Sequence, residues 1–492
     1  MIFTIAAAAL CSSLLAGPPG MDLPPMPLST GIPTTVDQAD LTALGRYIAE
    51  DDGAFKWDLV RTTEVDGVKV YDIRLTSQAW RVEGEVDHPV WTHWLTIGVP
   101  AKVESATPIM VVGGGRRRDE PREKPGNELM MFQRGSGAIV CVVDNVPNQP
   151  LRFAGDDHDR TEDDLLAHTW NLAMEKDDAR WIGRFPMVKS VKRAMDAAEQ
   201  FLAKQDLSFA AINGTPIAAG FKPDGFFVTG ASKRGWTTWL IGAVDPRVKA
   251  ICPIVIDVLN LKAQTAHHWA SYGFWAPALK DYVNNHIAEK FGSPELARVM
   301  VHEDPLAYMK FLGRIPKLVV TASGDEFFPT DSFRHYEKQI AGEWRLRTVP
   351  NAGHNLAGST APLEVLAFYK AVVSGTPRPT LVWELTRGES GPVLTATAGS
   401  KPERVVVWVC EGRKTRDFRF TETGKAWTST EVTPADGTGL VYRWIKKTPE
   451  AGYTAFFMEF TFPPAKAFGP SMVFTTRSFV TPDVLPFEGK QP

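Results

Sequence analysis

Cysteine is scarce in this chain of 492 residues, which holds only four, and none of them forms a CxxC motif. A chain of this size does not need disulfides to stabilise its core, and isolated cysteines do not make a zinc site. Cys141, Cys252 and Cys410 each stand in an apolar run, so we expect buried thiols in strands. The adjacent His267 and His268 lack metal-ligand spacing. We therefore interpret them as structural and expect no metal or other cofactor.

An excess of charge of one sign is also absent, because 54 Lys and Arg residues face 57 Asp and Glu residues and the net charge is −3. Such a chain has no overall basic field to hold nucleic acid or an anionic membrane, so we expect neither as a partner. Beyond the N-terminal segment, no window of about 18 uncharged apolar residues occurs, and no transmembrane helix is predicted.

The N-terminal segment from Ile2 to Ala16 is apolar or small and carries no charge. It is too short to span a bilayer but typical of a signal-peptide core. We predict a signal peptide at residues 1–16, an extended linker at 17–35, and export to the periplasm or the medium. An apolar start without a targeting role is the alternative, since the first basic residue is Arg46.

Hydrophobic periodicity predicts strands that alternate with helices. Alternating residues at Lys56 to Leu75 and Val90 to Val99 predict antiparallel strands. Continuous apolar runs predict parallel strands buried on both faces. These runs are Pro108 to Gly115, Ala138 to Val143, Phe226 to Gly230, Val248 to Ile256 and Lys317 to Ala322. Steps of three and four predict a helix over Met187 to Ala203. The fold class expected is α/β, with a doubly wound, mostly parallel sheet.

These patterns divide the chain after its linker into three predicted parts. An N-terminal β-rich extension is expected at residues 36–104 and an α/β core at 105–378. Within the core, residues 258–307 separate two strands and are numerous enough to form a helical cap. From about Pro379 onward the helical period gives way to alternating strands, which predicts a C-terminal β-sandwich-like domain at 379–492.

The stretch FFVTGASKRGWTTWLIGAV, from Phe226 to Val244, joins an apolar strand, a sharp turn and a helix. This order is typical of a nucleophile elbow, in which a strained turn exposes a serine hydroxyl above the sheet. The usual pattern is G-x-S-x-G, whereas here Gly235 falls one place later and Arg234 takes the usual glycine position. The pattern predicts Ser232 as a nucleophile, and a plain strand-to-helix connection is the alternative.

Two further residues follow in the chain order of an α/β-hydrolase triad, which is Ser, then Asp or Glu, then His. Asp325 comes just after the strand-like run that ends at Ala322, where open α/β sheets build their sites. His354 lies in a glycine-containing loop after the run Arg345 to Val349. We expect His354 as general base and Asp325 as the carboxylate that orients it. Taken alone, each is equally well explained as a turn or surface-loop residue.

An oxyanion hole is expected from backbone N–H groups. One is the N–H of Lys233, and another comes from Gly114 or Gly115, which follow the apolar run Ile109 to Val112. A plain glycine-rich turn is the alternative for these glycines.

Four side chains near these motifs are candidates for a substrate pocket: Arg234, Trp269, Tyr272 and Trp275. Aromatic side chains pack in cores more often than they line pockets. For Arg234 the alternative is a pairing with a carboxylate, which the acidic run from Asp156 to Asp164 is able to supply.

Six segments carry a resemblance to a known family. They are VPNQPLRFAGD (Val146 to Asp156), EDDLLAHTW (Glu162 to Trp170), WIGRFPMVKSVKRAMDA (Trp181 to Ala197), GASKRGWTTWLIGAVDPRV (Gly230 to Val248), SGDEFFPTDS (Ser323 to Ser332) and VPNAGHNL (Val349 to Leu356). They resemble the PhoPQ-activated pathogenicity-related proteins, which are secreted and α/β-hydrolase-like. The resemblance implies an N-terminal β-rich extension, a hydrolase core with Ser232, Asp325 and His354 as triad, and a C-terminal β-domain. It implies no substrate.

Together these observations predict an exported serine hydrolase that cleaves a peptide or a carboxylic ester through an acyl-enzyme on Ser232. The partner expected is a small-molecule or short-peptide substrate. Two alternatives stay open: an esterase for carbohydrate or uronic acid esters, and a catalytically silent α/β-hydrolase-fold protein that binds or signals.

Overall fold

The computed structural model describes residues 26, 42–212, 214–465 and 469–490. The predicted signal peptide lies outside the described residues, and so does the predicted linker apart from Met26. Among the residues described, no helix combines the length and the apolar character that crossing a bilayer requires.

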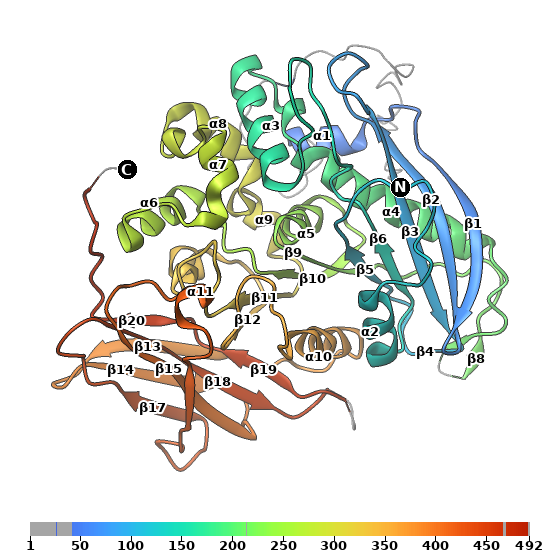
Figure 1. Cartoon of the computed structure of the whole chain (residues 1–492). Coiled ribbons are helices and arrows are strands. Elements are labelled where there is room, and N and C mark those ends of the chain that lie inside the picture. Colours follow the sequence, from blue (N-terminus) through green and yellow to red (C-terminus); the bar gives the residue numbers. More distant parts are fainter. Residues whose placement is uncertain (1–25, 27–41, 213, 466–468, 491–492) are drawn as a thin grey trace, which may run out of the picture.

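Nine strands form one central sheet in the order β1-β2-β3-β6-β5-β9-β10-β11-β12 (Figure 1). Pairs from β1 to β6 are antiparallel, and pairs from β6 to β12 are parallel. The strands are β1 (Lys56–Val65), β2 (Val68–Ala79), β3 (Val90–Pro100), β5 (Ile109–Val112), β6 (Val140–Val143), β9 (Phe226–Ala231), β10 (Val248–Ile254), β11 (Lys317–Ala322) and β12 (Trp344–Val349). The predicted doubly wound, mostly parallel α/β sheet is confirmed.

Helices cover both faces of this sheet because alternate residues of its strands point to opposite sides. Met110 and Val112 belong to one hydrophobic core, whereas Ile109 and Val111 belong to the other. The first face is covered by α1 (Ala43–Ala49), α3 (Glu162–Lys176), α4 (Arg184–Lys204) and α5 (Lys233–Val244), and the second by α2 (Asn127–Ser136) and α10 (Ala361–Val373). The helix predicted over Met187 to Ala203 is thus the inner part of α4.

The predicted strand from Lys56 to Leu75 is a hairpin of two strands, β1 and β2. Asp66 and Gly67 connect them with φ angles of 51° and 76°. Positive φ at both central residues is the geometry of a tight hairpin turn, which reverses the chain and leaves the alternation of side chains intact on both sides.

Residues 258–307 lie between β10 and β11 and form a helical segment, and their assignment as a cap insertion stays a prediction. Its helices are α6 (Leu261–Tyr272), α7 (Lys280–Asn284) and α8 (Pro294–Glu303), and the short α9 (Met309–Leu312) follows. Both α7 and α8 pack against α3 (Figure 1). We call this segment the cap.

A completely buried salt bridge ties the end of the cap to the core. Arg184 Nε donates to Glu303 Oε2 at 2.8 Å, and neither side chain has exposed area. Trp170 Nε1 donates to the other carboxylate oxygen at 2.8 Å. Arg184 Nη1 donates to the carbonyl of Lys233 at 3.1 Å, so this pair also supports the first residue of α5.

Glu303→Ala is expected to lower the free energy of unfolding by about 3 to 5 kcal/mol, because it leaves the Arg184 charge buried without its partner. Urea unfolding followed by tryptophan fluorescence measures this loss. Glu289→Ala, which breaks an exposed pair with His286, is the control and is expected to leave stability nearly unchanged. A loss of under about 1 kcal/mol for Glu303→Ala would contradict the assigned role.

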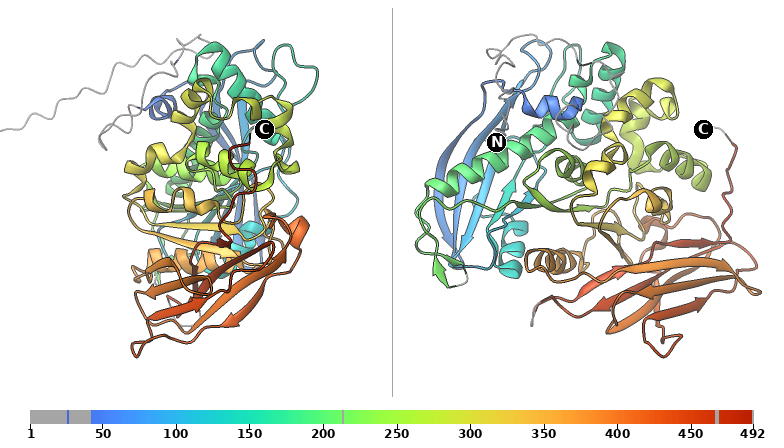
Figure 2. Two further views of the ribbon diagram at one scale, coloured as in Figure 1. Left: turned by 90° about the vertical axis from the view of Figure 1, so that its left-hand side faces the viewer. Right: turned by 180° about the vertical axis from the view of Figure 1, so that it is seen from behind.

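The strands within residues 381–465 and 469–481 form two antiparallel sheets that pack together at one end of the molecule (Figure 2). Tyr442 and Phe460 from opposite sheets meet at 5.4 Å between ring centroids, and Trp444 and Phe456 meet at 5.2 Å. One sheet holds β13 (Leu381–Arg387), β14 (Pro392–Ala398) and β17 (Val441–Ile445), and the other β15 (Arg404–Arg413), β16 (Thr428–Glu431), β18 (Tyr453–Phe462), β19 (Met472–Thr475) and β20 (Phe479–Thr481), with α11 (Phe420–Thr423) between β15 and β16. We call this part the C-terminal domain.

The predicted division into domains stays a prediction, and one feature of the sheet bears on it. Strands β1 to β3, which fall in the predicted N-terminal extension, belong to the same sheet as the core strands. A small additional sheet joins β4 (Lys102–Val103), β7 (Ala211–Ile212) and β8 (Thr215–Pro216).

Cys141, Cys252 and Cys410 are buried in β6, β10 and β15, as the sequence predicts.

Candidate active site

Ser232 stands at the sharp turn between β9 and α5, with φ of 56° and ψ of −128°. This conformation is strained for any residue other than glycine. Two glycines make room for the turn. A Cβ on Gly230 would lie 2.8 Å from the carbonyl oxygen of Arg234, and one on Gly235 would lie 2.9 Å from the carbonyl oxygens of Gly230 and Ile254. The later glycine of the G-x-S-x-x-G pattern therefore lets α5 approach β9 and β10 closely.

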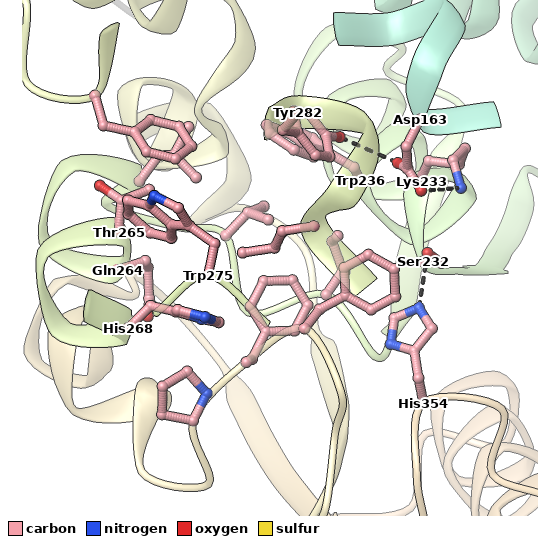
Figure 3. Close-up of a pocket in the computed structure, with 18 of the residues that line it drawn as sticks. Asp163, Ser232, Lys233, Trp236, Gln264, Thr265, His268, Trp275, Tyr282 and His354 are labelled. Atoms are coloured by element: carbon pink, nitrogen blue, oxygen red, sulfur yellow. Dashed lines mark hydrogen bonds and ion pairs between the residues drawn. The ribbon is translucent and has the colours of Figure 1, made fainter. Parts of the chain in front are cut away.

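The structure brings the three predicted triad residues into one hydrogen-bonded row. His354 Nε2 lies 2.8 Å from Ser232 Oγ (Figure 3). Nδ1 of the same ring lies 2.9 Å from Oδ2 and 3.0 Å from Oδ1 of Asp325. With its proton on Nδ1, the imidazole presents an unprotonated Nε2 to the serine hydroxyl. This is the geometry that general-base activation of a serine requires.

The charges around His354 set its basicity. Burial of the ring lowers its pKa, but the charge of Asp325 and the hydrogen bond to it raise the pKa more strongly. Lys233 lowers the pKa and Asp163 raises it to a lesser extent. The net result is a pKa of His354 raised above its ordinary value of 6.5.

Two carboxylates near this row were not singled out by the sequence analysis. Glu326 Oε2 accepts a hydrogen bond from the backbone N–H of His354 at 2.7 Å. Asp257 follows β10, bonds to the hydroxyl of Tyr336, and has a pKa that burial raises to about 7. In the sequence, Glu326 is indicated by its position directly after Asp325. Asp257 is indicated by its position just beyond a buried strand.

Glu162, at the start of α3, binds both basic residues that follow Ser232. Its carboxylate oxygens each accept a 2.7 Å hydrogen bond from Arg234, and Oε2 lies 2.9 Å from Lys233 Nζ. Arg234 Nε also donates to the carbonyl of Val146 at 2.6 Å. The alternative expectation for Arg234, a pairing with the acidic run, therefore describes the structure. Its expected place in a substrate pocket is corrected, because three of its N–H groups make these internal bonds and it does not line the cavity beside Ser232.

The glycine loop after β5 lies beside the elbow. A Cβ on Gly114 would come within 2.7 Å of Arg234 Nη2, so a larger residue there would displace this guanidinium. Gly115 has φ of 115°, which side chains disfavour, and its carbonyl accepts a hydrogen bond from Gln149 at 2.8 Å. Lys233 is the first residue of α5, where a backbone N–H has no partner within its own helix. The oxyanion role of Lys233, Gly114 and Gly115 stays a prediction.

A cavity lies beside Ser232 and His354 and is walled on its far side by the cap (Figure 3). The space open to the centre of a water-sized sphere is about 70 Å³, and all the space between the wall atoms, open solvent at the mouth included, is about 700 Å³. Most of the residues of its wall are apolar, and seven of them are aromatic: Trp170, Trp236, Trp275, Tyr282, Phe291, Phe327 and Phe328. Such a wall suits an uncharged, bulky group of a ligand.

Two lining residues carry charge, and they neutralise each other. Lys233 Nζ lies 3.1 Å from Asp163 Oδ2, and the hydroxyl of Tyr282 donates to Asp163 Oδ1 at 3.1 Å. Both ionic side chains are thus partnered before any ligand enters. A charged group placed in this cavity would find no unpaired opposite charge among these residues.

Of the predicted pocket aromatics, Trp275 lines the cavity, whereas Trp269 and Tyr272 do not. The helical period of α6 directs Leu261, Gln264, Thr265 and His268 to the cavity and places Trp269 at the edge of that face. Tyr272 is on the same face as these four residues but beyond the end of the cavity. Tyr272, one turn further on, packs against Phe274 and below Arg419 instead. His268 was expected to be only structural, yet it contributes to the wall. Burial lowers its pKa to about 3, so it is neutral there.

Comparison with known proteins places the chain in a family. The model of the PhoPQ-activated pathogenicity-related proteins matches residues 44–419. Autocrine proliferation repressor protein A of Dictyostelium discoideum is 34% identical over 472 residues, which cover 91% of this chain and 92% of that protein.

Solved structures with lower similarity are also found. Acetyl xylan esterase 1 from a Thermoanaerobacterium species is 15% identical, with a TM-score of 0.45 over 69% of this chain and 96% of that one. A glucuronoyl esterase from Solibacter usitatus is 12% identical, with a TM-score of 0.38 over 69% of this chain and 94% of that one. By the match of the family model and the 34% identity to a relative of nearly the same extent, the chain belongs to the PhoPQ-activated pathogenicity-related protein family.

Proposed function

We propose that this protein is an exported serine hydrolase that cleaves an ester or amide through an acyl-enzyme on Ser232. The observation that carries the proposal is the 2.8 Å contact between His354 Nε2 and Ser232 Oγ, with Asp325 bound to the opposite ring nitrogen. The predicted export rests on the uncharged apolar segment from Ile2 to Ala16.

In the proposed reaction, Ser232 Oγ attacks the carbonyl carbon of the substrate while its proton passes to His354 Nε2. The carbonyl oxygen becomes an oxyanion, for which the N–H groups of Lys233 and of Gly114 or Gly115 are the candidate donors. The bond to the alcohol or amine then breaks, and that group leaves with the proton from His354. A water molecule, deprotonated by His354, attacks the acyl group and releases the acid and free Ser232.

Labelling with a fluorophosphonate, which reacts with activated serines, tests this proposal. The full-length protein is expected to incorporate one probe per chain, on the peptide that carries Ser232. Absence of labelling in folded protein, with Trp275→Ala also unlabelled so that blocked entry is excluded, would overturn the proposal.

A second candidate is a binding or signalling protein that does not turn over a substrate. The curated relative is named for repression of proliferation, which describes a signalling effect and not a reaction. An intact hydrogen-bonded row from Asp325 to Ser232 argues against it, because a protein without catalysis has no need to preserve all three groups. The second candidate becomes the better description if the labelling fails.

The cavity predicts which acyl groups are preferred. For esters with one common leaving group, we expect kcat/KM to be about 10 to 100 times higher for phenylacetyl than for acetyl, since burial of a ring contributes about 1.5 to 3 kcal/mol. Trp275→Ala is expected to reduce this preference, and Trp57→Ala, on the distant strand β1, is the matched control that retains it. Equal rates for both acyl groups would show that the cavity does not receive the acyl group.

A further inference from the structure

Two loops carry the groups that act on Ser232, and they are bonded to each other. We call residues 323–329 the aspartate loop and residues 350–356 the histidine loop. Gly324 N donates to the carbonyl of Ala352 at 3.0 Å, and Ser323 N donates to that of Val349 at 2.9 Å. With the bond between Glu326 and the backbone of His354, the two loops form one connected unit at the ends of β11 and β12.

The C-terminal domain binds this unit through backbone and side-chain hydrogen bonds. Asn351 of the histidine loop makes two bonds to the backbone of Trp427: Nδ2 donates to the carbonyl at 2.8 Å, and Oδ1 accepts from the N–H at 2.9 Å. Phe420 N, at the start of α11, donates to the carbonyl of Gly324 at 2.7 Å. Figure 1 shows α11 beside the ends of β11 and β12. Both loops are therefore held by the same domain.

The anchor of these bonds is packed in the interior of the C-terminal domain. Trp427 is buried, and its ring lies 5.3 Å from that of Phe457 on β18. At the other end of the contact, the backbone of Asn351 has φ of 53°. Asn is one of the few residues that tolerate this left-handed conformation. A side chain with one acceptor and one donor, held in this conformation, fits the two backbone groups of Trp427.

We propose that the C-terminal domain positions the proposed triad, and that Asn351 is the positioning residue through which it fixes His354. The inference rests on the proposed function of Ser232. His354 follows Asn351 by three residues, so the two bonds to Trp427 restrict where its ring sits between Asp325 and Ser232. A displacement of about 1 Å at such a site is enough to reduce the rate about a hundredfold.

Asn351→Gly is the variant that tests this inference, because glycine accepts the positive φ and removes only the side-chain bonds. We expect kcat to fall about 10- to 100-fold, with KM changed less than about twofold. We also expect faster hydrogen exchange in the histidine loop, measured by mass spectrometry on the full chain. Asn351→Asp, which keeps the acceptor for Trp427 N–H, is expected to recover part of the rate.

Thr475→Val is the matched control. It removes a 2.9 Å hydrogen bond between the same two parts of the molecule, from Thr348 N on β12 to Thr475 Oγ1, without touching either loop. We expect it to lower the thermal midpoint while kcat stays near that of the wild type. A second probe is Gly324→Ala, whose Cβ would lie 2.8 Å from Phe420 N and push the aspartate loop away from α11.

The outcomes separate this inference from the proposed function. Wild-type kcat in Asn351→Gly, or a loss of rate that only parallels the loss of stability in Thr475→Val, would overturn the positioning role. If the wild type shows no serine reactivity, the proposed function fails, and hydrogen exchange alone then decides whether Asn351 holds the histidine loop. Equal exchange in wild type and Asn351→Gly would overturn the inference in that case also.

Discussion

Ser232→Ala is expected to lower kcat about a millionfold, the size of effect that follows loss of the nucleophile in a serine hydrolase. No other described hydroxyl in the cavity wall stands within hydrogen-bond reach of His354 Nε2, which contacts Ser232 Oγ at 2.8 Å. Steady-state hydrolysis of the preferred ester, together with fluorophosphonate labelling, measures the loss. Labelling that persists in Ser232→Ala would contradict the assignment of the nucleophile.

The same position gives an independent check on folding. Ser232→Ala keeps the strained φ of 56° and is expected to leave the thermal midpoint nearly unchanged. Ser232→Gly, equally inactive, is expected to raise it, because glycine releases strain of about 1 to 3 kcal/mol at such a conformation. An inactive Ser232→Ala with a strongly lowered midpoint would show that the loss of activity came from unfolding.

Asp325→Asn is expected to lower kcat/KM about ten-thousandfold at neutral pH, since an amide in this place favours the wrong tautomer of the imidazole. His354 must be neutral to accept the serine proton, so activity falls as the pH drops through its pKa. The charge of Asp325 raises this pKa above 6.5 against the effect of burial. The wild type is therefore expected to lose activity with a midpoint above pH 6.5.

Without the Asp325 charge, burial and Lys233 lower the pKa of His354, and only the weaker effect of Asp163 still raises it. The residual activity of Asp325→Asn is therefore expected to fall at a lower pH than that of the wild type. A pH profile of kcat/KM measures both midpoints. Glu326→Gln is the control, because it removes a neighbouring charge but keeps an acceptor for the backbone N–H of His354. A midpoint that moves as far in Glu326→Gln as in Asp325→Asn would contradict the special role of Asp325.

Sequence patterns predicted the elements of this fold well where the evidence was local. The buried strands of the core follow from continuous apolar runs, and α4 follows from apolar residues at steps of three and four. The turn at Ser232 follows from small residues between a strand and a helix, although the glycine at position 235 is one place later than usual. The order of Ser232, Asp325 and His354 along the chain indicated that the three residues share one site.

The sequence did not predict which side chains meet in space, because this depends on which face of a helix or strand packs against which neighbouring element. Trp269 and Trp275 look alike in sequence, but only Trp275 lines the cavity. Arg234 looks like a substrate contact beside the nucleophile, yet its guanidinium binds Glu162 through two hydrogen bonds. Asn351 carries no sequence signal at all, because its partner Trp427 lies 76 residues further along the chain.

The sequence by itself determined the α/β sheet, the elbow and the three residue types at the ends of β9, β11 and β12, because periodicity and turn sterics act over a few neighbouring residues. Only the tertiary structure decided the aromatic wall of the cavity, the neutralised Lys233 and Arg234, and the hold of the C-terminal domain on both loops. These features depend on contacts between segments that are distant in the sequence and are brought together when the hydrophobic cores are buried. Which side chains then meet is set by how their shapes pack.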